Sequence, residues 1–138
     1  MSNSNSSSGS GLHHVALKVA DFDATVKFYI EGLGMCPAMA WGEGDSRAVM
    51  LDAGHGNFIE IFAGGSSEPR PEGTMLHFAL RAQDVDAALQ RAVTAGATVT
   101  MPPTALTVPA SPIPCNVYIA FCTGPSGETI EFFRSEDL

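Results

Sequence analysis

Two segments of the chain share one pattern of apolar and polar positions, and each predicts a strand followed by a helix. Residues 14–21 match residues 77–84 position by position, and each run is a short apolar stretch that ends at an aspartate. After each aspartate, apolar residues recur at spacings of three and four, which is typical of a helix with one buried face. Residues 22–33 and 85–93 are therefore predicted helices that end at glycines.

Each predicted helix is followed by strand-like runs separated by glycine-rich turns. These runs are 35–41, 47–52 and 57–62 in the first half, and 98–101, 116–122 and 128–133 in the second. Asp21 and Asp84 stand where helix N-caps are expected. The stretch 102–114 holds five prolines, which lack the backbone donor that a ladder needs, so we predict a loop there, either a binding loop or a plain solvated connection. Each half therefore reads as βαβββ.

Length and composition fit one domain with a real hydrophobic core. The chain has 138 residues, of which 45% are hydrophobic and 16% charged. We interpret residues 1–11, almost all Ser, Asn and Gly, as a disordered tail, and residues 12–138 as a single domain. Within it we expect module one at 12–64, a linker at 65–73 and module two at 74–138.

Charge and cysteine content narrow the possible partners. The formal net charge of −8 disfavours nucleic acid and anionic membrane surfaces. No run approaches the roughly 20 apolar residues of a membrane span. Cys36, Cys115 and Cys122 are an odd number without a C-x-x-C pair, which favours a reduced, cytoplasmic location over a disulfide scaffold.

Four polar residues recur at matched places in the two halves. Glu60 and Glu131 each interrupt an apolar final strand, where a charge is costly unless it is paired, binds a metal or faces a cavity. His14 and His77 occupy corresponding places in the first strand of each half. Two imidazoles and two carboxylates form a donor set that divalent metals accept, whereas each histidine alone could be an ordinary core residue. Strand alternation sends His13 to the other face.

These motifs resemble the vicinal oxygen chelate (VOC) superfamily, which includes glyoxalase I, methylmalonyl-CoA epimerase, extradiol dioxygenases, fosfomycin-resistance enzymes and bleomycin-binding proteins. The resemblance is carried by residues 14–21, 28–34, 59–60, 77–84 and 124–131. It implies an α+β fold of two tandem βαβββ modules that form a curved mixed sheet around a metal cleft, commonly completed by a homodimer. One divalent ion (Ni, Co, Zn, Mn or Fe) is then expected per site, and the family's ligand positions hold His14, Glu60, His77 and Glu131.

The resemblance also orders the possible activities. A fourth protein ligand, Glu60, argues against dioxygenases and fosfomycin-resistance enzymes, and a full ligand set argues against a purely drug-binding or ligand-sequestering protein; both remain alternatives. The favoured function is a lyase or isomerase of glyoxalase I type, in which a proton moves beside a metal-bound carbonyl. Glu131, or less favourably Glu60, would be the base. Lys18 and Arg81 share the faces of the histidines and would bind an anionic group of a small substrate. The lack of Lys and Arg in 102–116 argues against glutathione.

Overall fold

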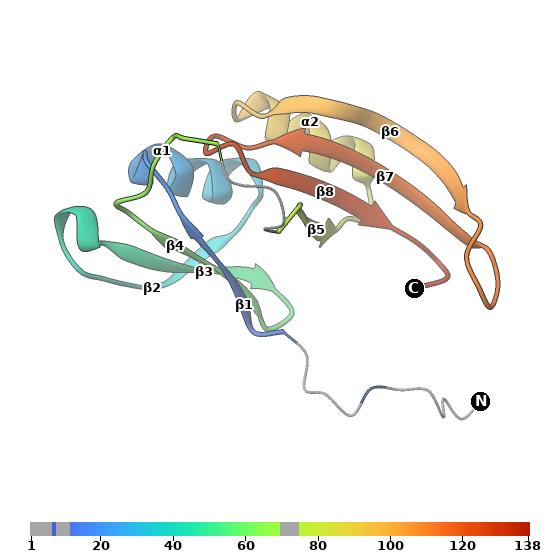
Figure 1. Cartoon of the computed structure of the whole chain (residues 1–138), viewed down its shortest axis with the longest axis horizontal. Coiled ribbons are helices and arrows are strands. Elements are labelled where there is room, and N and C mark those ends of the chain that lie inside the picture. Colours follow the sequence, from blue (N-terminus) through green and yellow to red (C-terminus); the bar gives the residue numbers. More distant parts are fainter. Residues whose placement is uncertain (1–6, 8–11, 70–74) are drawn as a thin grey trace.

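The computed structural model describes residue 7 and residues 12–69 and 75–138, which form two four-stranded mixed sheets (Figure 1). The first sheet has the order β1 (His14–Lys18), β4 (Asn57–Phe62), β3 (Ala48–Gly54) and β2 (Cys36–Trp41). The second has the order β5 (Phe78–Arg81), β8 (Thr129–Arg134), β7 (Cys115–Thr123) and β6 (Thr98–Val108). In each sheet the first two strands pair in parallel and the others antiparallel. The predicted tandem βαβββ fold is confirmed; the tail at 1–11, residue 7 excepted, and linker residues 70–73 lie outside the described residues.

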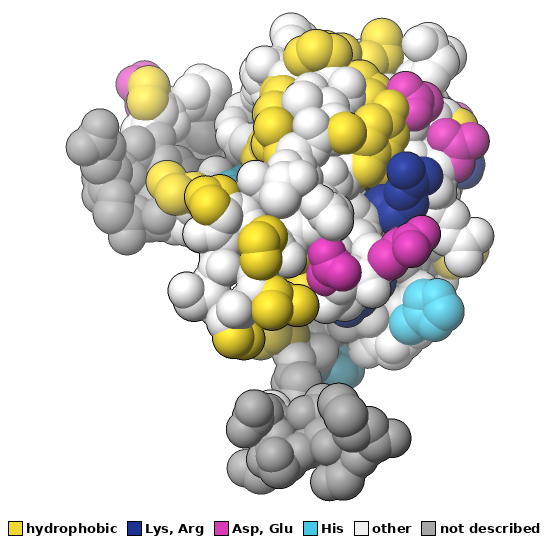
Figure 2. Space-filling view, turned by 90° about the vertical axis from the view of Figure 1, so that its right-hand side faces the viewer, with side chains coloured by type: hydrophobic (Ala, Val, Ile, Leu, Met, Phe, Trp, Pro, Cys, Tyr) yellow, Lys and Arg dark blue, Asp and Glu magenta, His cyan; other side chains and the backbone are white. Residues whose placement is uncertain are grey.

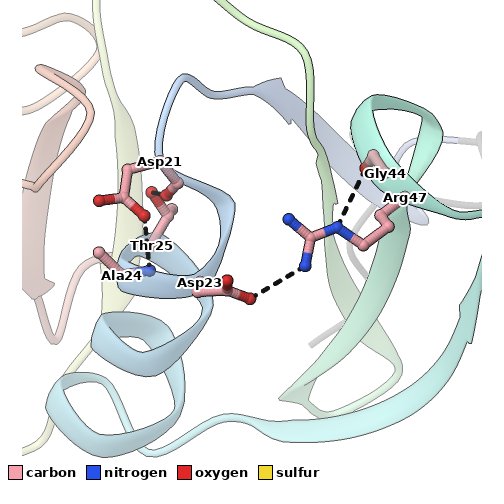
Figure 3. Close-up of polar contacts among 6 residues, drawn as sticks. All are labelled: Asp21, Asp23, Ala24, Thr25, Gly44 and Arg47. Atoms are coloured by element: carbon pink, nitrogen blue, oxygen red, sulfur yellow. Dashed lines mark hydrogen bonds and ion pairs between the residues drawn. The ribbon is translucent and has the colours of Figure 1, made fainter.

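Both predicted helix starts use the predicted caps. Asp21 precedes α1 (Phe22–Lys27), and its carboxylate accepts the backbone N–H of Ala24 at 3.1 Å (Figure 3). Asp84 precedes α2 (Val85–Thr94) and accepts a backbone N–H in the same way. The first predicted helix differs at its end, because its last turn is a separate π-helical segment, η1 (Phe28–Gly32). Capping thus fixes both helices at equivalent places after the first strand of each module.

A short 3-10 turn, η2 (Gly44–Ser46), joins β2 to β3 and is tied to the first helix by Arg47 (Figure 3). The Arg47 guanidinium donates to the carbonyl of Gly44 at 3.0 Å and to the carboxylate of Asp23 at 3.2 Å. It also lies over the ring of Phe22, 4.6 Å from its centroid. Arg47 therefore holds the β2–β3 connection against α1.

One hydrophobic core joins the two modules. Buried side chains from α1, η1 and the first sheet pack with those of α2 and the second sheet in a single cluster. At the margin of this cluster the Tyr29 hydroxyl donates to the half-buried Glu128 at 2.8 Å, and Thr25 and Ser126 share a hydrogen bond of 2.8 Å. Burial, followed by the charge of Glu128, raises the pKa of Tyr29 well above its ordinary value. The same two causes raise the pKa of the Cys122 thiol to about 11.

The predicted loop at 102–114 is wrong over its first part. β6 continues through Pro102 and Pro103 to Val108, with register shifts against β7 between Val99 and Met101 and between Met101 and Thr104. A strand at the edge of a sheet tolerates proline because one row of its N–H groups needs no partner, and bulges accommodate the change in register. Sequence patterning missed the strand because it treated proline as excluding any ladder.

The β6–β7 hairpin forms the right-hand end of the molecule in Figure 1. Leu106, Val108 and Ile113 are exposed there, and Figure 2, which faces this end, shows hydrophobic side chains in several separate groups. No helix in the described part of the chain is both long and apolar enough to cross a bilayer.

Candidate metal centre

The first sheet brings His14 and Glu60 together. The parallel register of β1 and β4 aligns Ala16 with Glu60, and His14 lies two residues before Ala16 on the same face. The distance from His14 Nε2 to Glu60 Oε1 is 3.6 Å. The imidazole is 40% exposed and the carboxylate 14%, so the pair opens to solvent through the histidine.

The second sheet repeats this arrangement. Ala79 on β5 aligns with Glu131 on β8, and His77 lies two residues before Ala79, just ahead of the strand. His77 Nε2 is 3.1 Å from Glu131 Oε1, with exposed fractions of 38% and 11%. The ring of Phe121 meets the His77 imidazole edge to face at 5.2 Å. Each module therefore carries the same pair at the same place in its sheet.

The chemistry of each pair fits a divalent metal. A neutral imidazole nitrogen and a carboxylate oxygen are donors that Zn, Ni, Co, Mn and Fe accept. Two donors bound to one cation at about 2.1 Å and at right angles stand about 3.0 Å apart, and the observed separations are 3.1 and 3.6 Å. His13 Nδ1 lies 2.9 Å from His14 Nδ1, which leaves Nε2 of His14 directed at Glu60. Such a contact to the second ring nitrogen orients an imidazole ligand.

The two pairs do not meet within one chain. Across residues 12–69 and 75–138, no group of three or more His, Cys, Asp or Glu side chains is placed to hold a metal ion together. The structure thus forms two His–Glu pairs, each of which supplies half of the predicted set. A four-ligand centre needs a second His–Glu pair from another source.

The predicted substrate-binding cations lie along the same faces as the histidines. Lys18 aligns with Phe62 on the strand that carries Glu60, and Arg81 aligns with Phe133 on the strand that carries Glu131. Both cationic residues are exposed. Each stands two residues beyond the row of its glutamate, about 7 Å along the strand.

The other two histidines, His13 and His55, do not form a pair with a glutamate as His14 and His77 do. His55 is exposed in the β3–β4 turn with a φ of 54°, as its position between two glycines predicts. His13 was expected on the opposite face, yet its ring both contacts His14 and stacks on Phe58 at 4.9 Å. His13 is therefore a neighbour of the first pair.

Met39 and Trp41 lie on β2, are 57% and 40% exposed, and were not among the residues predicted from the sequence to form a site. Register places both on the face that carries Glu60. The signal was present in the strand Cys36–Trp41, where Ala38 and Ala40 alternate with Met39 and Trp41. Alternation of small and large side chains on an edge strand distinguishes its two faces.

Comparison with known proteins identifies the family of the chain. The chain belongs to the Glyoxalase/Bleomycin resistance protein/Dioxygenase superfamily, whose profile matches residues 11–132. No protein of curated function matches the sequence closely enough to count as a relative.

Solved structures share the fold at low identity. A glyoxylase/bleomycin resistance protein/dioxygenase domain from Frankia sp. EAN1pec is 22% identical with a TM-score of 0.74, covering 94% of this chain and 100% of that chain. A mutant of the genomically encoded fosfomycin resistance protein FosX from Listeria monocytogenes, complexed with Mn(II) and 1S,2S-dihydroxypropylphosphonic acid, is 21% identical with a TM-score of 0.67, covering 89% of this chain and 88% of that chain. A superfamily member from Alicyclobacillus acidocaldarius is 18% identical with a TM-score of 0.67, covering 93% of both chains.

Proposed function

We propose that the protein is a metal-dependent lyase or isomerase of glyoxalase I type, which transfers a proton at a carbon beside a carbonyl group of a small substrate. The observation that carries the proposal is the repetition of one His–Glu pair at equivalent places in the two sheets, at 3.6 and 3.1 Å. Superfamily membership and the Mn(II) bound to FosX support the use of a metal in this fold.

The complete centre forms in a homodimer. His14 and Glu60 of one protomer meet His77 and Glu131 of its partner, because the two pairs of a single chain do not converge. Two-fold symmetry then generates two identical centres per dimer.

The residues then divide the work of proton transfer. A bound divalent ion (Ni, Co, Zn, Mn or Fe) would polarise the substrate carbonyl as a Lewis acid. Glu131, shielded from solvent and flanked by Phe121 on the neighbouring strand, takes the proton; Glu60 is the alternative base. Lys18 and Arg81 attract an anionic group of the substrate.

A second candidate is metal-dependent chemistry on a small phosphonate, as the ligand of FosX would allow. The fourth donor, Glu60, favours the lyase, because it fills a position that such enzymes leave open for substrate. A cytoplasmic setting, favoured by the free thiols of Cys36, Cys115 and Cys122, is part of the main proposal.

The activity is tested in deuterated water. Metal-loaded protein is incubated with hemithioacetals and related α-hydroxycarbonyl compounds, and the product is analysed for deuterium. We expect incorporation that falls by roughly 10²–10⁴-fold in Glu131→Gln. Turnover that requires dioxygen, or no exchange with any such compound despite bound metal, would contradict the lyase.

Metal binding is tested separately by elemental analysis of protein purified without chelator. His77→Ala should abolish stoichiometric metal, whereas His55→Ala, which changes an exposed histidine of a turn, should leave it unchanged. Full metal occupancy in His77→Ala would overturn the ligand assignment.

A further inference from the structure

The face of the first sheet that carries Glu60 holds parallel rows of side chains, fixed by the strand register. The middle row is Ala16, Glu60, Met50 and Met39, and it includes the proposed metal ligand, Glu60. The next row, two residues further along β4, is Lys18, Phe62, Ala48 and Trp41. An aromatic row thus stands about 7 Å from the row of the glutamate on the same surface.

Trp41 and Phe62 form an aromatic pair in that row. Their rings meet edge to face at 6.2 Å and 83°, across Ala48, which is only 1% exposed. Trp41 itself is 40% exposed, and within residues 12–69 and 75–138 it is the one aromatic side chain among the exposed large hydrophobic residues. An indole in this position leaves a large apolar face in water.

The edge strand β2 directs its large side chains to the face that carries Glu60. Met39 and Trp41 point to the side of Glu60, while the smaller residues Pro37 and Ala40 point to the other side. A strand that served only the core would place its large residues toward the helices. The equivalent row of the second sheet ends in Thr104 where the first ends in Trp41, so the aromatic surface belongs to one module alone.

We propose that Trp41, with Met39 and Phe62, binds a planar unsaturated ring of the substrate by stacking. The inference rests on the proposed function in one respect, since it places the reacting end of that substrate beside Glu60. The ligand is a small arylated molecule carrying an anionic group, because the same row ends at the cationic residue Lys18. Any ligand with a planar π system can stack on a tryptophan side chain, whatever its other substituents.

The sole tryptophan of the chain makes a direct test possible. The single indole N–H signal in the nitrogen–proton NMR spectrum of metal-free protein is followed while 2-naphthoate is added. We expect a saturable shift of this signal with 2-naphthoate and none with cyclohexanecarboxylate, which has the charge without the planar ring.

Variants separate stacking from mere hydrophobicity, with 2-naphthoate affinity measured by calorimetry. Trp41→Phe should keep binding, and Trp41→Leu should weaken it by roughly five- to a hundred-fold. Val99→Ala is the matched control, because Val99 is also 40% exposed but lies on the other sheet, and it should bind as the unaltered protein does.

Three results would overturn the inference: an indole signal that does not move, equal affinities for Trp41→Leu and the unaltered protein, or a Trp41→Leu chain that dissociates because Trp41 contacts a second copy. Metal content distinguishes this failure from failure of the proposed function. Stoichiometric metal without a naphthoate response sinks only the aromatic subsite, whereas a naphthoate response in a protein that takes up no metal sinks only the metalloenzyme.

Discussion

Removing the Tyr29 hydroxyl tests how the two modules of one chain are held together. Tyr29 is fully buried in the common core, and its hydroxyl donates to Glu128 Oε2 at 2.8 Å. The other carboxylate oxygen accepts the backbone N–H of Ser126 at 2.8 Å, so each oxygen has its own donor. Tyr29→Phe keeps the ring and its packing and takes away only the donor to Oε2.

The expected cost follows from the type of bond. A hydrogen bond to a charged group contributes about 1.5–3 kcal/mol to the free energy of unfolding. For a domain of this size, 1 kcal/mol corresponds to about 3–5 °C in the melting temperature. We therefore expect Tyr29→Phe to melt roughly 5–15 °C below the unaltered protein.

The assay is urea and thermal unfolding followed by circular dichroism, with Tyr118→Phe as the matched control. Tyr118 donates to Asp86 over the same 2.8 Å, but this bond is exposed to water, which replaces a lost partner. Its removal should lower stability far less. If Tyr29→Phe shifts the urea midpoint no more than Tyr118→Phe does, the Tyr29–Glu128 bond between the modules contributes no stability of its own and the reasoning fails.

Three further predictions concern local features of the fold. Because burial and then a neighbouring carboxylate raise the pKa of Cys122 to about 11, from an ordinary value of 9.0, the folded chain holds a proton that the unfolded chain loses; stability should fall as pH rises from about 9 to 11, and alkaline unfolding of Cys122→Ala should show a shallower fall. Asp84→Ala should lower the free energy of unfolding by about 1 kcal/mol through loss of the α2 cap, whereas Asp84→Asn, which can still cap the helix, should lower it much less. Gly42→Ala would drive a Cβ into the backbone carbonyl oxygen of Ser46, whereas the Cβ of Gly44→Ala meets nothing within 4 Å. Both positions have positive φ, so the strain of that backbone is common to the two variants, and chemical denaturation should show a clearly larger loss for Gly42→Ala.

Local chemistry made much of the fold predictable. Asp21 and Asp84 mark the starts of their helices because a carboxylate before an apolar run caps free N–H groups, and both caps occur as predicted. The His and Glu pairs were also within reach, since strand alternation puts polar residues of matched strands on one face. Their mutual distances, 3.6 and 3.1 Å, needed the parallel register that only the structure supplies.

Other features depend on tertiary context that a sequence pattern does not contain. Pro102 and Pro103 enter β6 because that strand lies at a sheet edge, and edge position is a property of the whole sheet. The open surface around Trp41 likewise follows from the place of β2 at the edge of the first sheet. The packing of the two modules decides whether the two His–Glu pairs share one cleft. A sequence repeat predicts the same fold for each module but does not predict how the modules pack together.

The central claim is that two His–Glu pairs from different protomers make one metal centre, and complementation tests it most directly. One variant carries His14→Ala and Glu60→Ala, the other His77→Ala and Glu131→Ala; each is purified alone, and the two are also unfolded together, refolded as an equal mixture and analysed for bound metal. Each variant alone should bind none, and the mixture should recover about a quarter of the unaltered content, because half of the dimers are mixed and each of these has one intact centre. A mixture without metal, or either variant binding metal alone, would contradict a centre shared between protomers.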